Sequence, residues 1–201
     1  YKAGNSIAAD LSLYHNGLDD NGQGLTYGIN ISNLGTKIGY TNDAKSKDFI
    51  PANFGAGIAY TWAVDETSKF SLALDVNKLL VPATPVATGD YSTDSANIAD
   101  YRTASIFNSW FKSFSNKAIT FSGGAEYTYN DQFSLRAGYF YEGKNQGGRR
   151  YFTAGVGLKY NVFGFNFSYL APSGNGVTRN PLSNTLRFGI LFDLDADASA
   201  Y

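Results

Sequence analysis

Residues 54 to 64 read Phe54-Gly55-Ala56-Gly57-Ile58-Ala59-Tyr60-Thr61-Trp62-Ala63-Val64. Apolar side chains, mostly large, occupy the even positions, and small or polar side chains occupy the odd positions. A period of two is typical of a β-strand whose two faces differ in chemistry. The stretch is about as long as the roughly 9–11 residues with which a tilted strand crosses a bilayer. It therefore predicts a strand of membrane-crossing length.

The same alternation recurs along the chain and predicts about nine antiparallel strands in an up-and-down order. The eight further stretches are residues 7–15, 25–40, 70–79, 119–129, 133–141, 152–160, 163–169 and 186–194. The alternation slips by one residue near Ser32-Asn33, which predicts a β-bulge there. The composition agrees with an all-β class, because 15 Tyr, 15 Phe and 22 Gly favour strands and turns over helices.

The position of the charged residues distinguishes a membrane barrel from a soluble sheet, since a soluble sheet turns its charges to water and its apolar side chains to a core. Here the charges share a face with glycine and serine. They are Asp10, Asp75, Glu126, Arg136, Lys159 and Arg187. The opposite face carries residues such as Phe121, Leu135, Val156 and Phe188. A lipid-facing charge costs about 2–4 kcal/mol. The pattern therefore predicts a transmembrane β-barrel in the outer membrane of a Gram-negative bacterium, with the charges facing the lumen.

Short and long connections alternate, as they do between the periplasmic and extracellular ends of outer-membrane barrels. The tight turns are residues 65–68, 130–132 and 161–162, and the long loops are 41–52, 80–118, 143–150 and 171–183. The long loops are therefore expected outside the cell. A three-residue turn at 130–132 also places Glu126 directly opposite Arg136, where their charges attract.

The loop 80–118 changes to a helical period, which predicts one amphipathic helix of about three turns over residues 103–115. Its apolar stripe contains Phe107, Trp110, Phe111 and Phe114. Two interpretations remain open. In the favoured interpretation, the stripe packs on the barrel rim or dips into the membrane interface. In the other interpretation, the stripe docks a protein partner.

The sequence shows no feature of an enzyme, a metal site or a cofactor site. The chain has 0 Cys, which excludes thiolate chemistry, and no nucleophile-elbow motif accompanies its single His15. The alternating Asp193, Asp195 and Asp197 are interpreted as a solvated tail rather than calcium ligands. A net charge of -1 gives no reason to expect nucleic acid. The 201 residues, which have 0 Met, are expected to form a single domain that is one piece of a barrel whose upstream strands lie outside them.

Six stretches resemble the PorV family, the outer-membrane shuttle proteins of the type IX secretion system, in the barrel superfamily of the FadL fatty-acid transporters. They are residues 35–38 (GTKI), 40–43 (YTND), 75–82 (DVNKLLVP), 135–142 (LRAGYFYE), 151–164 (YFTAGVGLKYNVFG) and 180–188 (NPLSNTLRF). The resemblance implies a 14-stranded barrel of which this chain supplies the later strands. It implies that the protein is not an enzyme. It also implies that the protein binds the C-terminal domain of secreted cargo and transfers this cargo from the translocon to a cell-surface attachment complex. The tail 195–201 extends beyond the family pattern.

The alternative function is that of a FadL-like transporter or pore for small hydrophobic molecules. A transporter needs a continuous path through its lumen, and the glycine-rich inner face leaves room for either a plug or a ligand. Membrane lipid is an expected partner under both functions.

Overall fold

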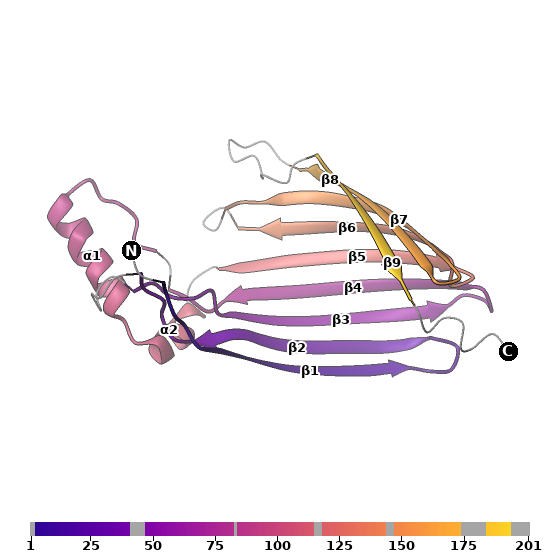
Figure 1. Cartoon of the computed structure of the whole chain (residues 1–201), viewed down its shortest axis with the longest axis horizontal. Helices are drawn as coiled ribbons and strands as arrows, with labels where there is room; N and C mark the ends of the chain where they lie inside the picture. The colour runs from indigo at the N-terminus through magenta and orange to yellow at the C-terminus, as the bar shows by residue number, and fades with distance from the viewer. Residues whose placement is uncertain are drawn as a thin grey trace. The chain divides into compact units, whose positions relative to one another are not determined.

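A computed structural model of the chain describes residues 3–40, 47–82, 84–114, 118–143, 147–173 and 184–193. Nine strands form one antiparallel sheet in chain order, so the predicted all-β, up-and-down arrangement is confirmed (Figure 1). The strands are β1 Ala8–Leu18, β2 Gly24–Gly35, β3 Asn53–Ala63, β4 Ser68–Leu79, β5 Ile119–Tyr129, β6 Phe133–Glu142, β7 Arg150–Tyr160, β8 Phe163–Pro172 and β9 Thr185–Phe192. The order ends at β1 and at β9, so the described strands form an open sheet rather than a closed barrel.

Three strand ends differ from the prediction by three residues or more, and the third is that of β8, which continues to Pro172 rather than ending at residue 169. Strand β1 continues to Leu18, beyond the predicted end at residue 15, because Asp19 closes the turn with its side chain. The Asp19 carboxylate accepts hydrogen bonds from the N–H groups of Asn21 and Gln23, at 2.9 and 3.0 Å. Strand β2 ends at Gly35 rather than at residue 40, and beyond it only an isolated bridge joins Ile38 to Asp48.

The predicted irregularity in β2 is present at Asn33, whose φ of 56° lies in the left-handed region. Its N–H donates to the Asp10 carboxylate at 2.7 Å. A residue that turns its N–H to a side chain interrupts the strand ladder, which agrees with the phase slip seen in the sequence.

The residues cluster into two compact units. The first unit comprises Tyr1–Leu13, Ile29–Ala56 and Asn77–Ile119, and it includes both helices. The second comprises Tyr14–Gly28, Gly57–Val76 and Thr120–Tyr201, and it includes β6 to β9.

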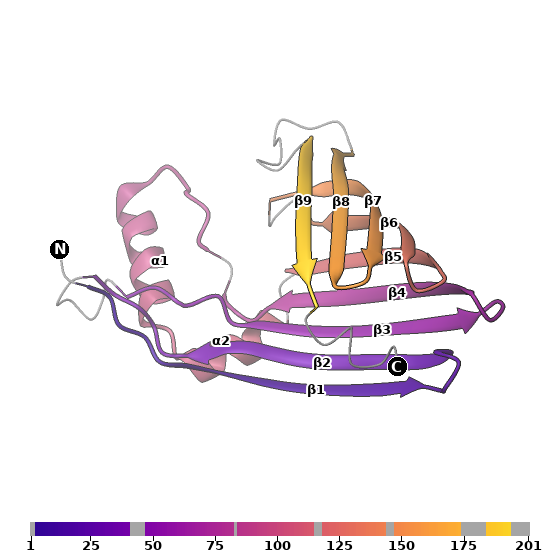
Figure 2. The same cartoon turned by 45° about the vertical axis from the view of Figure 1, so that its right-hand side comes forward.

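In the second unit, β5 to β9 pair as successive antiparallel hairpins, and Figure 2 shows them side by side. The β5–β6 turn has three residues, and two of them, Asn130 and Asp131, have positive φ of 54° and 53°. Asparagine and aspartate tolerate this conformation better than other residues with a Cβ. The turn sets Tyr129 against Phe133 and Glu126 against Arg136, so the predicted register is confirmed.

The sheet buries very few apolar side chains of its own. Among the described residues, the buried apolar ones are Ala52, Leu80, Ala118 and Leu170. Large apolar residues of the strands are exposed instead, and Phe188 is 78% exposed. Burial of apolar surface is the main favourable term in folding, and the strands leave much of theirs exposed.

The loop 80–118 contains two helices, so the single helix predicted over residues 103–115 is wrong in its bounds. Helix α1 spans Tyr91–Thr103 and helix α2 spans Ile106–Ser113, and Ser115 lies outside the described residues. The sequence pattern missed α1 because this helix has no apolar stripe and buries none of its residues. None of the described helices is long and apolar enough to cross a membrane.

A capping residue rather than packing starts α1. The Asp90 carboxylate accepts from the Thr93 N–H at 2.9 Å and from the Ser92 and Thr93 hydroxyls at 2.7 and 2.6 Å. The Thr93 and Ser92 hydroxyls, with the Thr93 N–H, lower the pKa of Asp90 to about 2. Such a cap satisfies N–H groups that have no partner within the helix.

The C-terminal end of α1 is held by Lys37. Its ammonium group donates to the carbonyl oxygens of Arg102 and Ala104, both at 2.6 Å, and lies 4.1 Å from the centre of the Phe49 ring. A cation is favourable at a helix C-terminus, where backbone carbonyls lack partners. Burial lowers the pKa of Lys37. Arg102 also pairs with Asp48 at 3.2 Å, so the segment after β2 fixes the end of α1.

Candidate functional site

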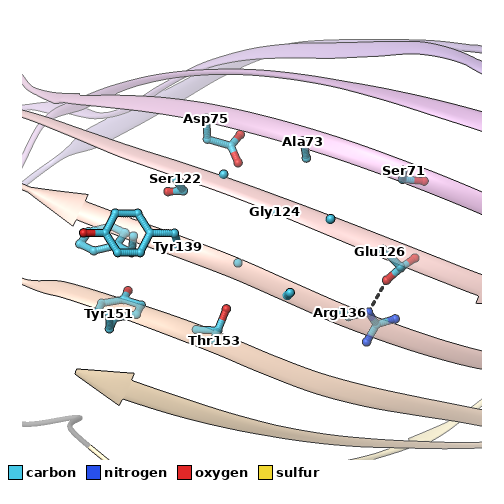
Figure 3. A pocket seen from close by; sticks show the side chains of 15 residues that line it. Ser71, Ala73, Asp75, Ser122, Gly124, Glu126, Arg136, Tyr139, Tyr151 and Thr153 are labelled. Carbon is cyan, nitrogen blue, oxygen red and sulfur yellow. Dashed lines mark hydrogen bonds and ion pairs between the residues drawn. The ribbon is translucent and has the colours of Figure 1, made fainter. Parts of the chain in front are cut away.

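A cavity of the second unit lies on the face of the sheet that carries the charged residues (Figure 3). Its volume is about 410 Å³. Three of the six predicted lumen charges line it, namely Asp75 on β4, Glu126 on β5 and Arg136 on β6. The rest of the lining is mostly small or hydroxylated, and it includes Ser71, Ala73, Ser122, Gly124, Gly138 and Thr153.

Small residues leave the space that the charged side chains occupy. A Cβ atom at Gly57 would lie 2.2 Å from Oδ1 of Asp75, and one at Gly138 would lie 2.8 Å from the Thr153 hydroxyl. Contacts this short would force the Asp75 and Thr153 side chains to move. The glycines on this face therefore let polar side chains lie flat against the sheet.

Arg136 is held in place from two sides. Its Nε donates to Oε2 of Glu126 on the neighbouring strand, and its Nη1 donates to Oδ1 of Asn166 at 2.8 Å. The sequence predicted the first contact from the register. Asn166 was not predicted, because it lies two strands away from Arg136 and no local pattern relates the two.

An aromatic pair also lies on this face and was missed in the sequence. Phe140 of β6 stacks on Tyr151 of β7, with ring centres 4.7 Å apart and planes at 11°. Both residues line the cavity. Phe140 is in phase with Arg136, so the period of two already places it on the charged face. The prediction considered aromatic residues only on the apolar face.

A tight ion pair closes the β6–β7 loop beside this stack. Nε and Nη2 of Arg149 donate to the two carboxylate oxygens of Glu142, each at 2.7 Å. The Glu142 side chain is only 5% exposed. Gly147 adopts a φ of 126°, and a Cβ atom there would lie 2.8 Å from Oε2 of Glu142. Glycine is thus required where the loop passes over the buried carboxylate.

The other predicted lumen charges are not among the residues that line this cavity. Asp10 belongs to the first unit and accepts from the Asn33 N–H at 2.7 Å. Lys159 pairs with Asp193 at 3.3 Å. Arg187 of β9 lines a second cavity together with Arg136.

Helix α2 turns its aromatic residues outward. Its buried residues are Ser109 and Ser113, which are 2% and 0% exposed. The predicted docking residues Phe107, Phe111 and Phe114 are 67%, 76% and 61% exposed. The fourth, Trp110, is half-buried and packs edge-on against Phe107 at 5.1 Å.

The inward side of α2 is formed by serines whose hydroxyl groups are satisfied within the helix. Ser109 donates to the Ser105 carbonyl at 2.7 Å, and Ser113 donates to the Trp110 carbonyl at 2.5 Å. Such back-bonding lets a short polar side chain be buried without an external partner. The small inward residues leave the aromatic side of α2 facing outward.

No group of three or more His, Cys, Asp or Glu side chains in the described part of the chain could hold a metal ion. His15 stacks on Tyr27 with ring centres 4.8 Å apart. It lies within β1, near the end of that strand at Leu18. Asp193 is engaged by Lys159, whereas Asp195 and Asp197 of the tail lie outside the described residues.

Comparison with known proteins supports the resemblance noted in the sequence. Residues 6–86 match the family model of the type IX secretion system protein PorV. The matched region contains β1 to β4 and includes three of the six similar stretches, residues 35–38, 40–43 and 75–82. No curated protein matches the chain. Over residues 6–86, which are less than half of its 201 residues, the chain is therefore similar to the PorV family of type IX secretion system proteins.

Proposed function

We propose that this chain forms part of the wall of an outer-membrane β-barrel that serves type IX secretion. In this role it binds the C-terminal domain of secreted cargo and passes the cargo from the translocon to a cell-surface attachment complex. The protein performs no catalysis of its own and needs no cofactor.

The observation that carries the membrane assignment is the reversed distribution of side chains. Polar and charged groups line cavities on one face of the sheet, while residues such as Phe121, Leu135 and Phe188 are exposed. Lipid is the solvent in which an exposed apolar face is stable and a charged face must turn inward. The family match supports the same location.

The observation that supports cargo docking is the outward aromatic side of α2, defined by Phe107, Phe111 and Phe114. Aromatic residues dominate the energetics of protein interfaces, and contiguous exposed apolar patches mark interaction sites. We assign this side to the cargo because the family match supports a role in protein secretion, in which an exposed loop that binds the secreted protein has a use.

Purification of the full-length protein from its native membrane tests this function. A mild detergent extract should yield translocon components, attachment-complex components and cargo C-terminal domains, each identified by mass spectrometry. A deletion of residues 91–113, which comprise both helices, should lose the cargo and keep the barrel. Recovery of the barrel with hydrophobic small molecules and without any secretion component would instead support the transporter.

A further inference from the structure

The register of the sheet places five inner-face residues in one row across β5 to β9. Glu126 lies opposite Arg136, Arg136 opposite Gly155, Gly155 opposite Ser168, and Ser168 opposite Arg187. Two arginines therefore flank the two small residues of the row. Their backbones are three strands apart, which corresponds to about 14 Å at the usual strand spacing.

The space between the arginines is a cavity of about 350 Å³. The side chains that line it are mostly polar or small and come from four adjacent strands. They include Arg136, Thr153, Asn166, Ser168, Thr185 and Arg187. No Asp or Glu is present among the described residues that line this cavity. The charged groups that line it are Arg136, whose charge is paired with that of Glu126, and Arg187.

The two arginines differ in how they are held. Arg136 is fixed by Glu126 and Asn166 through Nε and Nη1, so its Nη2 group remains for another acceptor. Arg187 has no hydrogen-bond or ion-pair partner in the described ranges of the chain. One guanidinium group is thus oriented in advance, and the other is available to close on a ligand.

Gly155 and Ser168 form the base of the cavity, where their short side chains leave space for a ligand. A Cβ atom at Gly155 would lie 3.0 Å from the Phe167 carbonyl oxygen and 3.4 Å from Cβ of Ser168, so a larger side chain does not fit there without a shift. Ser168 contributes a hydroxyl to the base, and the Thr153 hydroxyl borders it. Hydroxyl donors between two guanidinium groups are suited to an acceptor with several oxygen atoms.

We propose that this cavity binds a small hydrophilic oxyanion, with a phosphate or short carboxylate group held between Arg136 and Arg187. Its volume is near the lower end of the range of small-molecule sites, about 300–1,000 Å³, which favours a compact ligand. The small volume disfavours a long acyl chain. The ligand is a free anion or the headgroup of a larger molecule, since both offer the same oxygen atoms.

Calorimetric titration of the folded full-length protein in detergent tests this site, with inorganic phosphate, butyrate and dodecanoate as probes. Phosphate or butyrate should bind, and added sodium chloride should weaken the binding. Arg187→Gln should weaken the affinity at least tenfold, because it removes charge-assisted hydrogen bonds. Ser168→Leu should do the same by filling the base while both arginines remain.

The control is Lys159→Gln, which removes an inner-face cation that pairs with Asp193 and does not line the cavity. Its affinity should stay within about twofold of the unmodified protein, as expected for screened charges at a distance. A phosphorylated lipid headgroup that competes with phosphate would identify the headgroup as the source.

Three results would overturn the proposal: no binding of phosphate or butyrate, equal binding by the Arg187→Gln and unmodified proteins, or dodecanoate binding more than ten times tighter than butyrate. The measurement involves no cargo, so its outcome is independent of the role proposed for α2.

Discussion

Serine in place of Phe107, Phe111 and Phe114 is expected to reduce the export of secreted cargo at least tenfold, while the full-length protein still folds and inserts. The three rings are mostly exposed, so their loss removes few contacts within the chain. Aromatic residues at the centre of an interface contribute about 2 kcal/mol or more each, which exceeds a tenfold change in affinity. Cargo on the cell surface is measured by quantitative immunoblotting, and barrel folding by heat-modifiable electrophoretic mobility.

The matched control lies on α1, where Tyr91 and Ile98 are also exposed apolar residues. Serine at these two positions should leave export unchanged. Trp110 is left intact in both variants because it is half-buried, and its removal would confuse docking with stability. Normal export by the triple variant would exclude the docking role of α2. If α2 instead dips into lipid, the triple variant should fold less efficiently and lose export to the same extent.

Removal of the Arg149 side chain is expected to destabilise the β6–β7 hairpin by about 1–3 kcal/mol. Arg149→Ala leaves the buried Glu142 carboxylate without its two strongest donors. Arg149 is itself about half exposed, so the loss is smaller than for a fully buried pair. The urea midpoint of the folded protein in detergent measures the change.

A double variant separates the buried charge from the lost contacts. Glu142→Gln in the Arg149→Ala background should recover part of the stability, because a neutral amide costs less to bury than a carboxylate. The control is Lys69→Ala, which breaks an exposed pair with Asp131 and should cost less than about 1 kcal/mol. Equal losses of stability in Arg149→Ala and Lys69→Ala would show that the burial of Glu142 does not increase the cost of removing its partner.

The strands and one register were predictable because both depend on local patterns. The period of two requires only neighbouring residues, and the three-residue turn after Tyr129 determines which residues of β5 and β6 meet. The pairing of Glu126 with Arg136 follows from that turn alone. Patterns of this kind are robust because a shift by one residue exchanges the two faces of a strand.

Features that depend on distant contacts were not predictable in the same way. Helix α1 begins through the capping contacts of Asp90 and is held at its end by Lys37, which is more than sixty residues away along the chain. The sequence shows the apolar stripe of α2, but an amphipathic pattern does not determine whether the apolar side faces the rest of the protein or the solvent. The buried serines of α2 reverse the usual expectation.

The cavity between Arg136 and Arg187 also arises from long-range register. Each arginine appeared in the sequence as one more charge on the inner face. Only the pairing of four successive strands places Gly155 and Ser168 between them.

The alternation of lipid-facing and inward-facing side chains in β6 is the central claim, and a cysteine scan tests it most directly. The chain has 0 Cys, so single cysteines at positions 134 to 139 can be labelled with a nitroxide in the full-length protein, once any cysteine outside this chain has been replaced. In lipid bilayers, labels at Leu135, Ala137 and Tyr139 should collide mainly with oxygen, which concentrates in lipid. Labels at Ser134, Arg136 and Gly138 should not. Equal access of a water-soluble nickel reagent to all six positions, or alternation in the opposite phase, would contradict a membrane-spanning wall.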